Sequence, residues 1–305
     1  MKYFIIYGKI FSIIIFSVYL ISCGSENYEP DNYQLEVENP DIEGGLQINV
    51  ATYNLRRDGS EDNIEERLWI NRKEYVKKII KKYDFDIFGT QEGFQNQLLD
   101  ILELGNYAYI GVGRDDSINE GEHTAIFYKT DKFEVLDKGN FWLSETPNVP
   151  SWGWNASKRR VCSWGRFKEK ETGKIFLFVN THYDTVGSYN RLESTKLVLK
   201  KIEEISSDSL IFFTGDLNAL PSEESIQLLS SLGKLQDSRL VSVYPATGTE
   251  GTAHGYNLDG TISQRIDYIF VSKAILLIQY CVINDDIELG KFSSDHFPVM
   301  SKVKL

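Results

Sequence analysis

Short apolar segments that end in a polar residue recur along the sequence, and they constrain the fold more than any other feature. Residues 47–53 alternate polar and apolar side chains, as expected of a strand with one buried face. Residues 86–92, 175–181, 210–215 and 265–271 are short and largely apolar, which is typical of buried strands. Many short strands mixed with a few helices predict two packed sheets with helices outside them.

The remaining sequence predicts helices and further strands between these segments. Residues 64–83 form an amphipathic pattern with lysines on the outer face, as expected of a helix that packs on a sheet. Similar patterns predict helices over 96–104, 188–204 and 223–232, and strands over 107–111, 124–128, 133–141 and 299–303. Together these elements predict one α/β domain over residues 46–305.

The N-terminal residues are expected to lie outside this domain. Lys2 and Lys9 precede an apolar run over residues 10–22, which is too short to span a bilayer and is typical of a signal peptide. The run ends in LISCG, which resembles the lipobox of bacterial lipoproteins. Removal of residues 1–22 would leave Cys23 as the lipidated first residue. The alternative is a buried helix with an incidental cysteine.

A lipid on Cys23 would anchor the protein to a membrane without a transmembrane helix. Residues 24–45 are polar and acidic and contain Pro and Gly, which is typical of a flexible tether. We therefore expect a lipid-anchored protein of the bacterial cell envelope, in the outer membrane and facing the periplasm or the exterior. The sequence leaves the pairing of Cys162 and Cys281 open, although the apolar surroundings of Cys281 predict a core position.

Polar side chains occur at or just past the ends of the expected strands. In layered α/β folds, ligands bind in the crevice beyond strand ends, where side chains from several strands converge. Each of these residues alone has an ordinary explanation. Asn54 could form a turn, and His182 could be a buried histidine whose hydrogen bonds are all made within the protein. Asp267 is the exception, because a carboxylate among apolar strand residues needs a partner. The set comprises Asn54, Glu92, His182, Asp184, Asp216, Asn218, Asp267, Asp295 and His296.

The motifs around these residues occur in the order N, QE, NTHYD, GDLN, RIDYIF and SDH. Together they resemble the endonuclease/exonuclease/phosphatase superfamily (deoxyribonuclease I-like) across residues 46–305. The resemblance implies an α/β fold, a four-layered sandwich in which two mostly antiparallel β-sheets pack face to face and are flanked by helices. The segments GVGRDD (111–116) and FWLSETP (141–147) are similar to exported Bacteroides-type members nearest the carbon catabolite repressor and nocturnin branch.

The resemblance implies a metal-dependent phosphoesterase. Glu92 is the expected principal ligand of Mg²⁺, with Mn²⁺ as an alternative, because hard cations prefer oxygen ligands. Asn54 and Asp295 are expected to complete a site for one or two ions, and two ions would form a clamp on the phosphate.

The other members of the set are expected to act on the phosphate and the water. Asp267 would fix the ring of His296, which would activate water or stabilise the phosphoryl charge. Asp216 would orient the attacking water or protonate the leaving oxygen. Asn218 would hold a phosphate oxygen, and His182 would donate a hydrogen bond to the scissile phosphate.

Contacts farther from this centre are less closely defined by the motifs. Arg114, Arg160 and His254 are candidate substrate contacts, with surface salt bridges as the alternative for Arg160. Asp184 is expected to brace His182. The aromatic segment SWGW (151–154) suggests a loop that stacks on a base or a sugar, and an ordinary aromatic cluster is its alternative.

The formal net charge of −11 disfavours long nucleic acid, because such a field repels polyanions. We expect a Mg²⁺-dependent phosphoesterase, and within this class a phosphodiesterase, that acts outside the cytoplasm. Its substrate would be a nucleotide or RNA end, a phospholipid head group, or a phosphorylated glycan or small phosphodiester. We expect a monomer without an obligate protein partner. The alternative is a non-catalytic binding lipoprotein on the same fold, which the complete set of site residues disfavours.

Overall fold

The computed structural model describes residues 45–59, 62, 64–205, 207, 210–231, 233–285 and 291–305. The expected signal peptide, the lipidation site at Cys23 and all but the last residue of the expected tether lie outside the described residues. Among the helices that are described, none is both long enough and apolar enough to span a membrane.

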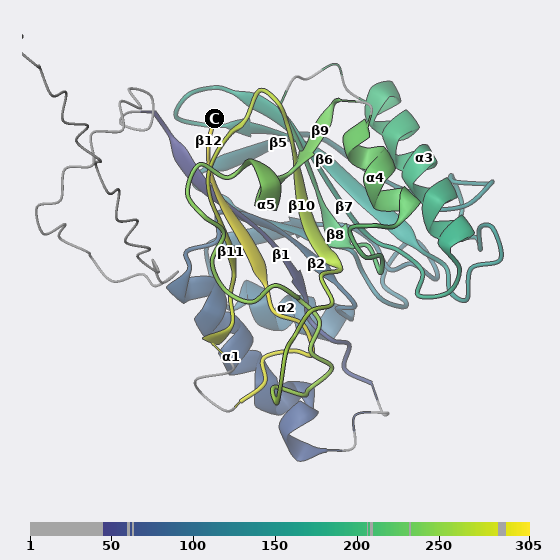
Figure 1. Ribbon diagram of the computed structural model, residues 1–305, viewed down its shortest axis with the longest axis vertical. Helices are drawn as coiled ribbons and strands as arrows, with labels where there is room; N and C mark the ends of the chain where they lie inside the picture. The colour runs from purple at the N-terminus through teal and green to yellow at the C-terminus, as the bar shows by residue number, and fades with distance from the viewer. Residues whose placement is uncertain are drawn as a thin grey trace, which may run out of the picture.

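The strands form two six-stranded sheets (Figure 1). The first has the order β11 (Leu276–Val282), β12 (Val299–Lys304), β1 (Gln47–Asn54), β2 (Ile87–Gln91), β4 (Ile126–Lys129) and β3 (Tyr107–Ile110). The second has the order β5 (Phe133–Trp142), β6 (Val161–Glu169), β7 (Ile175–His182), β8 (Ile211–Asp216), β10 (Asp267–Ser272) and β9 (Leu235–Asp237). β1 and β2 are parallel, as are β7 and β8, and the other pairs described are antiparallel.

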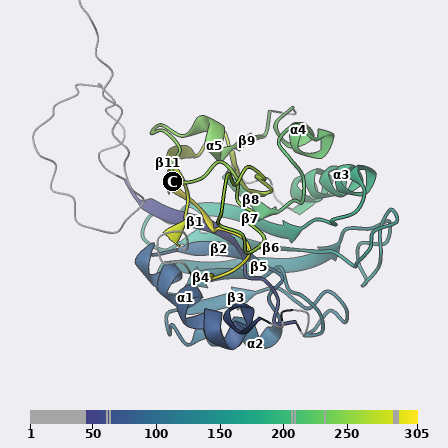
Figure 2. The same ribbon diagram turned by 60° about the horizontal axis from the view of Figure 1, so that its bottom comes forward.

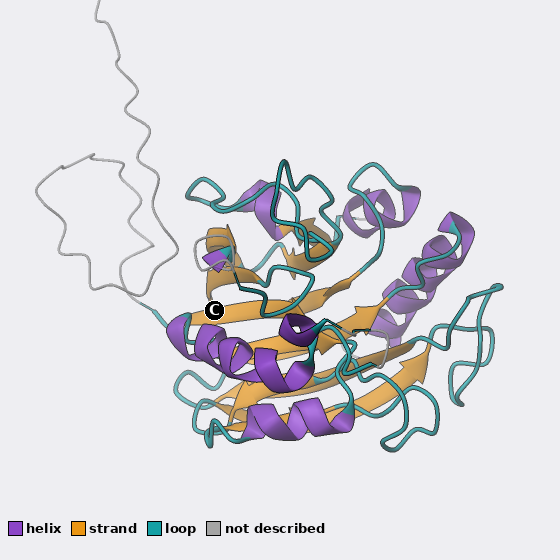
Figure 3. Ribbon diagram, turned by 90° about the horizontal axis from the view of Figure 1, so that it is seen from below, coloured by secondary structure: helices purple, strands orange, loops and turns teal. Residues whose placement is uncertain are grey.

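Helices cover the outer faces of both sheets, as Figures 2 and 3 show. The first sheet is covered by α1 (Trp69–Lys82) and α2 (Gln95–Leu102), and the second by α3 (Ser188–Ile205) and α4 (Glu224–Ser231). The shorter η1 (Glu65–Arg67) and α5 (Ser238–Val241) complete the helices of the described chain. The four-layered sandwich with two mostly antiparallel sheets is therefore confirmed.

Three apolar clusters hold these layers together. The cluster between the sheets contains Val50, Ile126, Phe178 and Phe212. The other two pack the outer sheet faces against the helices, and one of them contains Cys281, as expected. Burial of this apolar surface is the main favourable term in folding. The other cysteine within the described domain, Cys162, carries a buried free thiol.

A layer of buried polar side chains lies between the apolar core and one edge of the sandwich. Asn180 of β7 accepts hydrogen bonds at Oδ1 from Nε2 of Gln91 (2.8 Å) and from Oγ1 of Thr214 (3.0 Å). Its Nδ2 donates to the carbonyl of Thr90 (2.9 Å), so one side chain joins both sheets. Gly89 leaves room for this contact, because a Cβ there would lie 2.3 Å from Oδ1 of Asn180.

Some elements differ from those expected from the sequence. The helix expected over 64–83 is divided into η1 and α1, because Leu68 has extended backbone angles (φ −62°, ψ 138°). Strands β6, β9 and β11 and helix α5 were not expected. β6 alternates buried and half-exposed residues along most of its length, so its charged half-exposed residues obscured the strand pattern.

Candidate active site

Polar side chains at the ends of the central strands lie on the inward faces of the two sheets. Alternation along β1 puts Asn54 on the same side as Val50 of the inter-sheet core. In the same way, the inward faces of β7, β8 and β10 carry His182, Asp216 and Asp267 at the strand ends. Side chains from both sheets therefore meet at one edge of the sandwich, just above the buried polar layer.

Asn54 links Glu92 to Asp216. Its Nδ2 donates to Oε1 of Glu92 (3.2 Å) and to Oδ2 of Asp216 (3.0 Å), and its Oδ1 accepts the backbone N–H of Arg56 (2.9 Å). Glu92 follows β2 with φ 63°, a left-handed conformation that is uncommon for a residue with a side chain. Strain of this kind is concentrated at functional sites.

His296 and Asp267 form a buried pair. Nδ1 of His296 lies 2.9 Å from Oδ2 of Asp267. Burial alone would lower the pKa of His296, but the carboxylates of Asp267 and Asp216 raise it well above its ordinary value. The imidazole is therefore held as a cation beside the carboxylates.

Asp216 lies opposite Asp267 in the register between β8 and β10. Burial, and then the nearby charge of Asp267, raise the pKa of Asp216 to about 7. Its Oδ2 lies 3.9 Å from Nε2 of His296. A carboxyl group that titrates near neutral pH can accept a proton from water or donate one to a leaving oxygen.

Glu92 and Asp295 face a common positive group. Nη1 of Arg56 lies 4.0 Å from Oε2 of Glu92 and 3.8 Å from Oδ2 of Asp295. Two carboxylates beside the side chain of Asn54 fit a divalent cation such as Mg²⁺, which prefers hard oxygen ligands. Asn54 turns Nδ2 toward Glu92, so its amide would rotate to offer Oδ1 to the cation.

A second candidate cation site is formed by Asp216, Asp267 and His296. Each of the three offers one ligand atom, and these atoms lie within 4.8 Å of one another. Oδ1 of Asp267 has no hydrogen-bond partner among the described residues, so this carboxylate has an oxygen to spare. His296, however, already uses Nδ1 on Asp267, and the neighbouring carboxylates raise its pKa, so a cation at this ring would have to compete with a proton. The site at Glu92, Asn54 and Asp295 is therefore the better candidate for the cation.

His182 and Asn218 lie beside Asp216. Nδ2 of Asn218 donates to the carbonyl of Tyr183 (3.0 Å) and lies 3.0 Å from Nε2 of His182. Because an amide nitrogen donates, Nε2 of His182 accepts and its proton resides on Nδ1. Burial and the neighbouring Arg160 lower the pKa of His182 well below its ordinary value, so the ring is neutral. Nδ1 is buried without a hydrogen-bond partner in the described part of the chain and can donate to a ligand.

Arginine side chains surround Glu122 next to His182. Oε1 of Glu122 accepts from Nη1 of Arg57 (3.0 Å), and Oε2 contacts Nη1 of Arg114 (2.5 Å) and Nη1 of Arg160 (3.9 Å). Oε2 also lies 3.9 Å from Nδ1 of His182. A small cavity is lined by Arg114, Glu122, Arg160 and His182. The arginines outnumber the carboxylate in this group, which favours an anionic ligand.

Asp184 and His254 contact the site through other residues. Asp184 accepts from Oγ of Ser157 (2.9 Å) and from Nε of Arg160 (3.4 Å), so it holds the segment that carries Arg160. His254 packs against Phe297 with 4.4 Å between ring centroids, and its backbone N–H donates to the carbonyl of Asp295 (3.0 Å). The structure thus places His254 behind the Asp295–His296 segment rather than beside Arg114.

The structure brings the strand-end residues other than Asp184 into one cluster and adds residues that the motifs did not indicate. Arg56, Arg57 and Glu122 contact this cluster directly, and Thr252 contacts Asp267. Arg56 and Arg57 follow Asn54 after Leu55, so their place beside this motif was the signal that could have indicated them. Glu122 lies between the two segments that resemble exported relatives, and neither segment includes it. No pattern in the sequence indicated Thr252.

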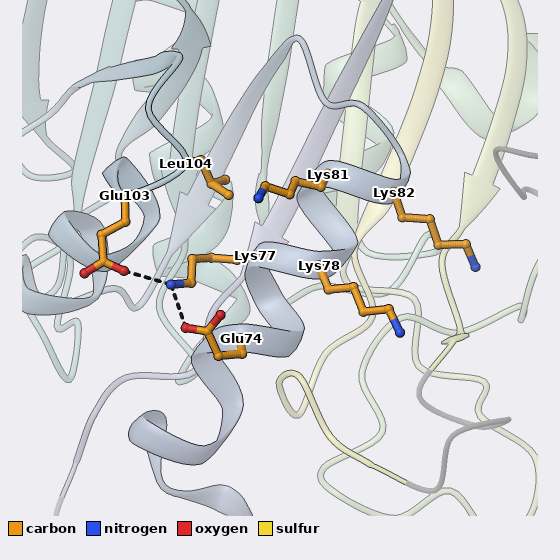
Figure 4. Close-up of a pocket in the computed structure, with 7 residues that line it drawn as sticks. All are labelled: Glu74, Lys77, Lys78, Lys81, Lys82, Glu103 and Leu104. Atoms are coloured by element: carbon orange, nitrogen blue, oxygen red, sulfur yellow. Dashed lines mark hydrogen bonds and ion pairs between the residues drawn. The ribbon is translucent and has the colours of Figure 1, made fainter.

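A separate surface hollow lies between α1 and α2, away from the strand ends (Figure 4). Nζ of Lys77 bridges Glu74 (2.6 Å) and Glu103 (2.8 Å) there. None of the strand-end residues contributes to it, and its charges are partly neutralised by these ion pairs. Its lining residues are Glu74, Lys77, Lys78, Lys81, Lys82, Glu103 and Leu104.

Comparison with known proteins gives matches over most of the chain. A model of the Endonuclease/Exonuclease/phosphatase family matches residues 51–296. The solved structure of a mannosyl-6-phosphatase from Bacteroides thetaiotaomicron is 42% identical, with a TM-score of 0.81, and the match covers 85% of this chain and 100% of that one. A family protein from Bacteroides vulgatus is 34% identical, with a TM-score of 0.80, covering 85% of this chain and 99% of that one.

More distant matches include eukaryotic proteins. The human nocturnin catalytic domain shares the fold, with 19% identity and a TM-score of 0.67, covering 86% of this chain and 96% of that one. The Ccr4 3′-5′-exoribonuclease subunit of the CCR4-Not complex from Candida albicans is 24% identical over 302 residues. That match covers 78% of this chain but only 38% of the Candida protein.

Proposed function

Because this chain belongs to the endonuclease/exonuclease/phosphatase family, whose members are metal-dependent phosphoester hydrolases, we propose that it removes phosphate from a phosphorylated sugar. The family expected from the motifs is thereby confirmed. The sugar phosphate is supported by the mannosyl-6-phosphatase, which is matched over 100% of its chain at 42% identity. The phosphodiesterase activity expected from the motifs is retained as the second candidate.

The observation that carries the catalytic proposal is the convergence of the His296–Asp267 pair, Asp216 and Glu92 at one edge of the sandwich. A divalent cation held by Glu92, Asn54 and Asp295 would neutralise charge on the phosphate. We propose Mg²⁺, with Mn²⁺ as a substitute, because the donors are oxygen atoms.

The residues of the chain supply the remaining parts of the reaction. The cationic His296 stabilises negative charge on the phosphoryl group, and Asp267 fixes its ring. Asp216 orients the attacking water or protonates the leaving oxygen. Nδ1 of His182 would donate to a phosphate oxygen. The amide of Asn218, whose two protons contact Tyr183 and His182, would orient this ring instead of holding the phosphate itself.

The arginines beside His182 would bind the same phosphate from its other side. Arg114 and Arg160 both contact Glu122, whose carboxylate fixes them in place. Guanidinium groups recognise phosphate oxygens with directed hydrogen bonds. Because these two side chains are buried at the edge of the strand-end cluster, they favour a compact terminal phosphate over the continuous backbone of a polynucleotide.

A nucleotide or an RNA end is the second candidate substrate, and the similarity to Ccr4 favours it. The net charge of −11 argues against a long polyanion but not against a short one. We also propose that the protein acts outside the cytoplasm as a lipid-anchored monomer, from the lipobox-like segment at Cys23. Labelling with a fatty-acid analogue should mark the wild-type protein, and Cys23→Ser should abolish the label.

The test of the proposed function is a substrate panel with Mg²⁺ and with EDTA. The panel contains mannose 6-phosphate, p-nitrophenyl phosphate, bis-p-nitrophenyl phosphate, nucleotides, oligoribonucleotides and sphingomyelin. We expect EDTA-sensitive release of phosphate from mannose 6-phosphate, with loss in His296→Ala and Glu92→Ala. Equal hydrolysis by the wild type and both variants would refute the site, and absence of all activity would favour a binding protein on this fold.

A further inference from the structure

Trp152 is exposed on the loop between β5 and β6, and its ring is stacked by an arginine. The side chain is 55% exposed, which is high for a residue of this size. Cζ of Arg159 lies 3.7 Å from the centroid of its ring, and Nη1 of Arg159 lies 3.1 Å from Oδ1 of Asp115. The three side chains therefore form one surface group, which we call the Trp152 group, with an aromatic face and an ion-paired edge.

The loop that carries Trp152 is fixed on both sides of the ring. Oγ of Ser151 lies 2.6 Å from Oγ of Ser144, and Nδ2 of Asn190 donates to the carbonyl of Gly153 (2.5 Å). A Cβ on Gly153 would lie 2.2 Å from the carbonyl oxygen of Leu143, so the chain here requires glycine. The exposed ring is thus held by a fixed backbone, and a preorganised ring loses less entropy when a ligand stacks on it.

The Trp152 group borders the arginine residues of the active site. Asp115 directly follows Arg114, and Arg159 directly precedes Arg160. Arg114 and Arg160 both face Glu122, which lies 3.9 Å from His182. In the second sheet the order β6-β7-β8-β10 puts this group on the side of His182 that is opposite to β10. A substrate whose phosphate contacts His182 would extend its other end toward Trp152.

The chemistry of the Trp152 group matches a sugar ring. A pyranose has a face of C–H groups, which packs on an aromatic ring, and an edge of hydroxyls, each of which donates and accepts hydrogen bonds. Arg159 supplies donors and Asp115 supplies acceptors beside the indole. Arg159 already covers one face of the Trp152 ring, so only the opposite face can stack on a ligand. One sugar ring can pack there, whereas the indole cannot lie between two nucleic-acid bases.

We propose that Trp152, Arg159 and Asp115 form the subsite that binds the sugar ring of the substrate. The inference rests on the proposed function. It assigns residues of this chain to the sugar ring, which is the part of the substrate that distinguishes a sugar phosphate from other phosphomonoesters. It predicts that these residues set KM for sugar phosphates and affect other phosphate esters less.

The kinetic test compares two substrates in each variant. We expect Trp152→Ala and Asp115→Asn to lower kcat/KM for mannose 6-phosphate about tenfold relative to that for p-nitrophenyl phosphate, through KM rather than kcat. Trp152→Phe should restore most of the loss, because it keeps an aromatic face. Tyr244→Ala removes an aromatic ring that is 41% exposed beside β11 and serves as the matched control. An equal loss on both substrates overturns the subsite and leaves the proposed function standing.

A binding test separates the subsite from turnover. In EDTA, titration of mannose 6-phosphate followed by tryptophan fluorescence should give a Kd that rises about tenfold in Trp152→Ala. That result supports the subsite even where the wild-type protein fails to hydrolyse the sugar phosphate, in which case only the proposed function is refuted. If Trp152→Ala weakens binding of adenosine monophosphate but not of mannose 6-phosphate, the ring binds a base and the sugar proposal is overturned.

Discussion

The hydroxyl of Thr252 lies 2.6 Å from Oδ2 of Asp267, the same oxygen that contacts Nδ1 of His296. Oγ1 of Thr252 also accepts the backbone N–H of Asp267 (3.1 Å). The carboxylate is therefore fixed by a neighbour that is not one of the strand-end residues. In this respect Thr252 is a positioning residue for His296.

Replacement of Thr252 should slow the reaction without unfolding the protein. Thr252→Val keeps the shape of the side chain but removes the donor, so Asp267 can rotate away from His296. We expect kcat for p-nitrophenyl phosphate to fall about tenfold, the lower end of what loss of an outer partner costs a functional group. Thr252→Ser, which keeps the hydroxyl, should retain most of the rate. Full activity in the valine variant would show that Thr252 plays no part in positioning Asp267.

The buried polar layer below the site predicts a loss of stability when Asn180 is replaced. Asn180→Leu would leave Nε2 of Gln91 and the carbonyl of Thr90 without this partner inside the sandwich. Each buried polar group left unpaired costs about 1–3 kcal/mol, so we expect the free energy of unfolding in urea to fall by about 3 kcal/mol. Asn148→Ala, at an exposed position, is the matched control. A change below about 0.5 kcal/mol, the usual range of surface substitutions, contradicts the structural role of the layer.

The sequence predicted the site better than it predicted the surroundings of the site. Asn54, His182, Asp216 and Asp267 could be found because strand ends and alternation are local properties, and alternation alone puts these side chains on inward faces. Asn180 contacts Thr90 across 90 residues of sequence, and such contacts depend on how the two sheets pack.

Strand β6 and Glu122 illustrate the same limit. The charged half-exposed residues of β6 lie on the second sheet next to a long β5, and its strand character comes from pairing with β5 and β7. Glu122 lies outside the assigned strands and resembles an ordinary surface acid in the sequence, yet the fold buries it among arginines. Propensity and periodicity contain no information on either arrangement.

Asp184 predicts a pH-dependent contribution to stability. Burial would raise the pKa of this carboxyl, but the N–H groups of Val186 and Ser157 and the charge of Arg160 lower it below its ordinary value. A lowered pKa means that the stabilisation is fully present above about pH 4 and is lost as the pH falls through the folded-state value. We expect Asp184→Asn to lose about 2 kcal/mol of unfolding free energy at pH 7 and clearly less at pH 3.

Urea unfolding of the wild type and Asp184→Asn at both pH values measures this difference directly. Other carboxylates titrate in the same range, but they contribute equally to both proteins and cancel in the comparison. A difference between the two proteins that stays constant from pH 7 to pH 3 contradicts the lowered pKa of Asp184.

The facing carboxylates of Glu92 and Asp295 predict that a divalent cation stabilises the folded protein. Both groups lie within 4.0 Å of Nη1 of Arg56, and the same guanidinium also pairs with Asp62 (3.0 Å), so one positive charge serves three carboxylates. A ligand that binds only the folded state raises its stability by about 2.7 kcal/mol at 100 times Kd, so Mg²⁺ should raise Tm of the EDTA-treated wild type. Glu92→Gln, which keeps the shape and removes the charge, should abolish most of this shift, whereas Asp100→Asn on α2 should leave it intact. An undiminished shift in Glu92→Gln would place the cation elsewhere, and Asp267→Asn would then test the neighbouring donor group of Asp216, Asp267 and His296.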